Sequence, residues 1–111
     1  MVYFKEGKLR EEFHKLDSRV RKIAYVLSTL MDALHGEKAT VTSVYREDVH
    51  SPHHFYRAID LRSRDIKPEA CVYLEAILNV IFPYEKEAHQ TVIYHDSGQG
   101  IHFHIQVKPE M

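Results

Sequence analysis

A stripe of apolar residues spaced three or four positions apart predicts one long amphipathic helix in the first third of the chain. Asp17 or Ser18 is expected to begin it, because short polar side chains cap helix N-termini, and His35-Gly36 is expected to end it. The stripe that should face the core consists of Leu16, Val20, Ile23, Leu27, Leu30, Met31 and Leu34.

A second helix is predicted to begin at Pro68, because proline suits the first turn of a helix. Pro83 should end it, since proline cannot continue a helix. The stripe expected to face the core is Ala70, Tyr73, Leu74, Ile77 and Ile81.

Stretches rich in β-branched residues predict strands at Ala39–Tyr45 and Tyr56–Leu61, joined by a loop. A β-hairpin is predicted near the end, where Thr91–Tyr94 leads through the turn Ser97–Gly100 into a return strand, Ile101–Val107. The first dozen residues allow a short strand at 2–4 followed by an extra helical turn.

Two main helices and about four short strands, not in regular alternation, predict an α+β fold with a small antiparallel sheet. No repeat, linker or low-complexity stretch divides the chain, so residues 1–111 are expected to form one domain. Residues of the hydrophobic class make up 44% and charged residues 28%, a balance that argues against disorder of the whole chain.

The net charge of -1 gives no electrostatic argument for a nucleic-acid partner. No apolar run approaches the roughly 18 residues that span a bilayer, and the charged opening segment lacks the apolar core of a signal peptide. We therefore expect no membrane span and a cytoplasmic location as synthesised. The single cysteine, Cys71, cannot form an intramolecular disulfide and is expected to be a buried, inert thiol.

Nine histidines in 111 residues are unusual, and two of them lie on the predicted return strand. Because side chains alternate along a strand, an apolar set should face the core: Ile101, Phe103, Ile105 and Val107. His102, His104 and Gln106 then share the open face. Two imidazoles at this spacing can share one metal ion or one substrate, although a polar outer face explains them equally if they stand alone.

Asp60 lies inside an otherwise apolar strand, where a carboxylate is costly unless it is paired. Arg57 or Arg62 could pair with it at the surface. Alternatively, Ala58 and Tyr56 share its face, and the small alanine leaves room for an ion near a histidine of the incoming loop. One carboxylate and two imidazoles make a three-ligand zinc set with a fourth position open to water.

These residues carry a family resemblance. The pattern Ser51-x-His53 followed by Ala58-x-Asp60-Leu61, then His102-x-His104 on a late strand, resembles the zinc metallopeptidases of the D-alanyl-D-alanine carboxypeptidase group. These enzymes share a core with lysostaphin-type endopeptidases and the hedgehog signalling domain. The segment Thr42–Arg46 is similar to the family strand that ends in Ser-Gly-Tyr-Arg, so the match runs from about residue 40 to residue 107.

The resemblance implies a zinc-dependent peptidase that hydrolyses short peptides, typically peptidoglycan stem peptides containing D-amino acids. It implies His53, Asp60 and His104 as zinc ligands and His102 as a catalytic residue beside the metal. Arg46 would bind a substrate carboxylate or polarise its carbonyl, and Ser51 would help to order the site. His54, adjacent to the first ligand, is the alternative to His53, and His50 and His95 are expected on loops that rim the cleft.

Three positions depart from the family pattern. Tyr56 stands where the family has a glycine, on the face assigned to the metal, where it could line the substrate cleft or bond the metal-bound water. Val44 replaces another glycine, and Ile101 replaces the glutamate that serves as general base in the acidic branch. Asp96 could fold back to supply the missing acid.

Two alternatives to a peptidase therefore remain open. One is a zinc-binding module on the same fold, used for recognition or assembly without catalysis. The other is an unrelated metal-dependent hydrolase or dioxygenase-like barrel, which predicts a mainly β chain. A cell-wall enzyme without a signal peptide would need release by lysis or carriage in a virion, so a phage-related role is a further hypothesis.

Overall fold

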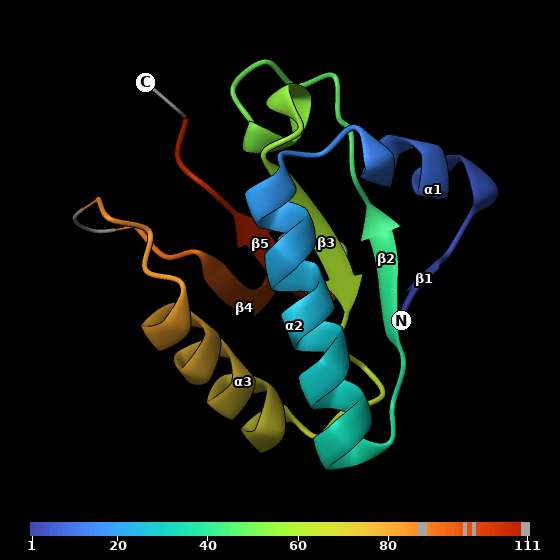
Figure 1. Ribbon diagram of the computed structural model, residues 1–111, viewed down its shortest axis with the longest axis vertical. Coiled ribbons are helices and arrows are strands. Elements are labelled where there is room, and N and C mark those ends of the chain that lie inside the picture. Colours follow the sequence, from blue (N-terminus) through green and yellow to red (C-terminus); the bar gives the residue numbers. More distant parts are fainter. Residues whose placement is uncertain (87–88, 97, 99, 110–111) are drawn as a thin grey trace.

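The computed structural model describes residues 1–86, 89–96, 98 and 100–109, and within them an α+β fold, as predicted (Figure 1). The elements in chain order are β1 (Val2–Phe4), α1 (Gly7–His14), α2 (Ser18–His35), β2 (Ala39–Ser43), the short 3-10 helix η1 (Pro52–Phe55), β3 (Ala58–Arg62), α3 (Pro68–Ile81), β4 (Val92–Asp96) and β5 (Ile101–Gln106).

The sheet has five strands in the order β1-β2-β3-β5-β4 rather than the predicted four. It is also mixed rather than antiparallel, because β1 pairs with β2 in parallel while the other neighbours are antiparallel. The parallel pair needs a long crossover, which α1 and α2 supply. The three helices of this fold argue against the mainly β barrel.

The predicted bounds of both long helices are confirmed. The Asp17 carboxylate accepts a hydrogen bond from the backbone N–H of Arg19 at 2.9 Å and so caps α2. Gly36 ends α2 with a φ of +64°, a left-handed conformation that suits glycine. α3 starts at Pro68 and ends at Ile81, directly before Phe82 and Pro83.

The predicted buried stripe of α3 is only partly correct: Leu74 is buried as predicted and Ala70 packs against the core, but the rest of the buried side differs. Cys71, Leu74 and Leu78 form its buried side, whereas Tyr73 and Ile81 are 66% and 52% exposed. Apolar residues occur on almost every side of this helix, so their spacing alone does not select the face that packs. The expected burial of Cys71 is confirmed, and burial raises the pKa of its thiol.

Both predicted inner strands have shifted bounds. β2 ends at Ser43 instead of Tyr45, and β3 begins at Ala58 instead of Tyr56. Tyr56 has a φ of +56° and caps η1, so the expectation that it shares a strand face with Asp60 is wrong. The turn of η1 brings the chain into β3 two residues later than the sequence pattern indicates.

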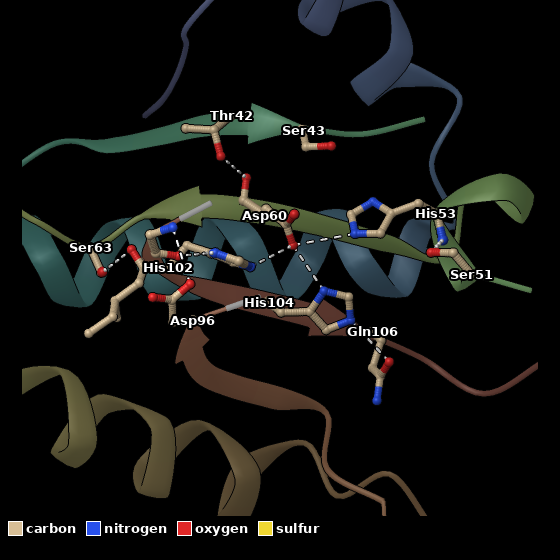
Figure 2. Close-up of polar contacts among 12 residues, drawn as sticks. Thr42, Ser43, Ser51, His53, Asp60, Ser63, Asp96, His102, His104 and Gln106 are labelled. Atoms are coloured by element: carbon tan, nitrogen blue, oxygen red, sulfur yellow. Dashed lines mark hydrogen bonds and ion pairs between the residues drawn. The ribbon is translucent and has the colours of Figure 1, made fainter. Parts of the chain in front are cut away.

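The two faces of the sheet have different chemistry. Ile59, Leu61, Phe103 and Ile105 are fully buried in the hydrophobic core, and α2 and α3 cover the sheet on one side (Figure 1). Ile101 was expected in this set but is 52% exposed, because it lies next to the hairpin turn where β5 begins. The alternating residues Asp60, His102, His104 and Gln106 share the opposite face (Figure 2).

The pairing of β2 with β3 is irregular at one point. Val41 pairs with Leu61 but Ser43 pairs with Asp60, so the register shifts between Val41 and Ser43. Val41 is buried in the core, whereas Thr42 and Ser43 both line a cleft on the opposite face. A bulge of this kind aims two successive side chains at one site.

Within the described part of the chain, no helix combines the length and the apolar character needed to cross a membrane.

Candidate metal centre

His53, Asp60 and His104 come together on the open face of the sheet. His53 lies in η1, Asp60 in the middle of β3 and His104 in β5, directly opposite Asp60 in the strand pairing. One potential ligand atom from each lies within 4.8 Å of the others. The three side chains that the resemblance implies as ligands therefore form a cluster that can hold a metal ion.

Asp60 is the centre of this cluster, as Figure 2 shows. Its Oδ1 atom lies 2.9 Å from His104 Nδ1, 3.3 Å from His53 Nε2 and 3.5 Å from His102 Nε2. Its Oδ2 atom pairs with the guanidinium of Arg46. Since the carboxylate is only 4% exposed, these contacts replace the water that it has lost.

The tautomer of His53 is fixed by the backbone. Its Nδ1 lies 2.7 Å from the carbonyl oxygen of Val44, which can only accept, so Nδ1 carries the hydrogen. In the neutral ring, Nε2 then carries no hydrogen, and its lone pair is directed toward Asp60. This Nε2 atom is buried and has no hydrogen-bond partner.

A glutamine fixes His104 in the same way. The Nε2 amide group of Gln106 donates to the carbonyl of Gln90 at 2.9 Å, which turns its Oε1 toward His104 Nε2 at 3.0 Å. An amide oxygen only accepts, so His104 Nε2 carries a hydrogen. Nδ1 lies 2.9 Å from Asp60 Oδ1: in the charged ring it donates to this carboxylate, and in the neutral ring its lone pair is available to a metal ion.

Two imidazole lone pairs and a carboxylate oxygen that face one another need a cation among them, either protons or a metal ion. Burial would raise the pKa of the Asp60 carboxyl, but the His104 and His53 imidazoles outweigh burial and hold this pKa well below its usual range. Asp60 is thus ionised at neutral pH. Imidazole nitrogen with carboxylate oxygen is a donor set that suits zinc, and hydrogen bonds that fix the ligating rings are typical of metal sites.

Two further histidines lie beside the cluster. His102 Nδ1 donates to the carbonyl of Gly100 at 3.1 Å, which leaves Nε2 facing Asp60. His95 pairs with His102 across the hairpin, and its ring centre lies 5.1 Å from that of His102 and 5.9 Å from that of His104. His95 thus lies in β4 rather than on the loop we expected.

Burial, and then the neighbouring His102 and His104, lower the pKa of His95, so it is neutral near pH 7. Its Nε2 atom is buried without a hydrogen-bond partner. His95 directly follows the predicted strand Thr91–Tyr94, and extending that strand by one residue would have placed it opposite His102.

Arg46 is the partner of Asp60, not Arg57 or Arg62 as the surface-pair alternative required. Arg46 also donates to Ser43 Oγ at 3.2 Å, whereas Arg57 donates to the carbonyl of Val107. The guanidinium of Arg46 therefore orients the buried carboxylate from the side opposite the imidazoles.

Ser51 and Tyr56 shape the loop that carries His53. Ser51 Oγ accepts from the backbone N–H of His53 at 3.2 Å and caps η1, which agrees with an ordering role. The ring of Tyr56 stacks on Tyr45 with centres 5.2 Å apart.

His54, the alternative ligand, is not part of the cluster. Its Nδ1 lies 3.2 Å from the carbonyl oxygen of Arg46 and 3.4 Å from Tyr45 Oη. Asp96 does not supply an acid to the cluster either, because its Oδ1 accepts from the backbone of Gly98 and Gly100 in the hairpin turn. The predicted turn residues Ser97 and Gln99 lie outside the described residues.

Replacing Gln106 with leucine is expected to weaken zinc binding by about 10- to 100-fold, because His104 loses the acceptor that fixes its tautomer. Competition with a chromophoric chelator measures the affinity. Lys108, a half-buried residue just beyond the same strand whose ammonium pairs with Glu85 and not with the cluster, is replaced with leucine as the control. An unchanged affinity in the Gln106 variant would mean that His104 is not held as a ligand.

No protein-family model matches this chain, and no curated protein matches it either.

Proposed function

We propose that this protein is a zinc-dependent peptidase that hydrolyses short peptides, and that peptidoglycan stem peptides containing D-amino acids are its substrates. The observation that carries the proposal is the convergence of His53 Nε2, His104 Nδ1 and Asp60 Oδ1, with both imidazole tautomers fixed by acceptors outside the cluster. Three protein ligands leave a fourth position for water, as catalytic zinc requires.

When bound, zinc polarises a peptide carbonyl and lowers the pKa of a coordinated water to about 7. His53, His104 and Asp60 would hold the ion, while Arg46 holds Asp60 and Gln106 holds His104 in place. His102 lies at the edge of the cluster with Nε2 facing inward, a position from which it can accept a proton and return it to the leaving amine.

Some hydrogen-bond donors of Arg46 are available to a substrate. A guanidinium carries five N–H groups, and the contacts with Asp60 and Ser43 occupy only part of them. The side chain is 38% exposed. Its outward N–H groups can stabilise the developing oxyanion or hold a C-terminal carboxylate.

A zinc-binding module without catalysis is the second candidate. The observation that favours it concerns the cleft beside the metal centre, where Asp60 is the one acidic side chain among the described lining residues. Ile101 occupies the position of the family's catalytic glutamate. In this case the metal would organise a binding surface.

Removal of the metal separates the two candidates. Zinc-loaded protein is expected to hydrolyse D-alanyl-D-alanine peptides or peptidoglycan fragments, and a chelator should lower the rate by more than about 100-fold because the activated water is lost. Product release is measured by chromatography, with zinc added back as the control. Stoichiometric zinc binding without hydrolysis of any of these substrates would contradict the peptidase and favour the module.

A further inference from the structure

A cleft of about 370 Å³ adjoins the metal centre, with Asp60 and His102 on its wall. Four basic side chains also line it: Lys5, Arg46, Arg62 and Arg64. They come from separate parts of the fold. Lys5 follows β1, Arg46 follows β2, Arg62 ends β3 and Arg64 lies in the loop after β3. The topology therefore gathers charges that are scattered along the sequence.

The charge of this cleft differs from that of the whole protein. Four cations against one carboxylate give it a formal charge of +3, whereas the chain has a net charge of -1. Arg46 already pairs with Asp60. Among the described residues, Lys5, Arg62 and Arg64 form no ion pair, so three positive charges face the cleft without a protein counter-charge.

Arg62 connects the basic cleft to the metal centre. It pairs directly with His102 in the β3–β5 register, two residue pairs along from Asp60–His104 and therefore on the same face of the sheet. A ligand held by Arg62 therefore lies next to the proposed proton-transfer residue. Unpaired like charges repel one another, and an anionic ligand that binds between them relieves this repulsion.

We propose that this basic cleft binds a peptide with at least two carboxylates and places the neighbouring peptide bond at the metal centre. The inference rests on the proposed peptidase function and specifies its substrate class. Guanidinium groups match carboxylates with paired hydrogen bonds. The small volume fits a short ligand, and the net negative charge of the chain disfavours a long polyanion such as a nucleic acid.

The test compares acetyl-Ala-Glu-D-Ala-D-Ala, which has two carboxylates, with a neutral form that carries glutamine and a C-terminal amide. In zinc-free wild-type protein, calorimetry is expected to show at least about tenfold tighter binding of the charged peptide. The double variant Arg62→Gln/Arg64→Gln should lose this preference. Lys22→Gln/Lys86→Gln makes the same change in charge at two exposed lysines outside the cleft and should keep it.

The outcomes separate the cleft from the catalytic proposal. With zinc present, the arginine variant is expected to raise KM for the charged peptide about tenfold while kcat and zinc content stay unchanged. Selective binding without hydrolysis would support the cleft and contradict the peptidase. Equal binding of the charged and neutral peptides, or tighter binding of pyrophosphate or an oligonucleotide, would overturn the cleft proposal.

Discussion

Replacement of His53 with alanine is expected to remove stoichiometric zinc from the protein and to weaken zinc binding by well over 100-fold. Loss of an outer hydrogen bond to a ligand costs 10- to 100-fold, and loss of the ligand itself costs more. His53 Nε2 is buried and lies 3.3 Å from Asp60 Oδ1, so the variant loses one of the three converging ligand atoms. Zinc per chain after dialysis, measured by plasma mass spectrometry, gives the result directly.

His54→Ala is the matched control, because it removes the neighbouring imidazole whose Nδ1 contacts Tyr45 and Arg46 instead of the cluster. It should retain zinc. His104→Ala should behave like His53→Ala, since each supplies one of the three converging atoms. Full zinc occupancy in both the His53 and the His104 variants would refute the ligand assignment.

Replacement of His102 with alanine is expected to lower kcat by about 10²- to 10⁴-fold while zinc remains bound, because a positioned general base contributes a factor of this size. His102 Nε2 faces Asp60 from 3.5 Å, but His102 lies outside the three-residue group that can hold a metal. The measurement is kcat on a D-alanyl-D-alanine peptide together with zinc content in the same sample.

The zinc content of the variant distinguishes a proton-transfer role of His102 from a role as metal ligand. If the variant instead loses zinc in parallel with activity, His102 is a fourth ligand rather than a base. If it keeps full activity, the proton must be transferred by another group.

Strand alternation predicted the most important feature of the site from the sequence. It placed His102, His104 and Gln106 on one face of the return strand, and the structure has them on the face that carries Asp60. The signal is strong because Phe103 and Ile105 must be buried, which fixes the direction of every other side chain.

The contacts that fix the ligands could not be predicted. The Val44 carbonyl fixes His53, and Gln90 fixes Gln106, through backbone atoms whose position depends on the whole fold. The choice of Arg46 over Arg57 and Arg62 as the partner of Asp60 depends on where β2 ends. Hydrophobic periodicity contains no information about these contacts.

Tyr56 shows why one departure from the family pattern is compatible with the fold. The resemblance places a glycine there, and the backbone has the left-handed φ of +56° that glycine adopts without cost. A side chain in this conformation costs about 1–2 kcal/mol. Stacking of Tyr56 on Tyr45 offsets part of that cost.

Because of the register shift between Val41 and Ser43, the number of residues in β2 determines which of its side chains face the core and which face the site. Before the shift, the odd-numbered side chains face the helices, as Val41 does. After the shift this alternation is reversed, so that Ser43 lies on the open face beside Asp60. A substitution alters one position, but an insertion or deletion of a single residue would exchange inward and outward positions along the strand. We therefore expect an insertion or deletion within this five-residue segment to disrupt the site more than a single substitution there.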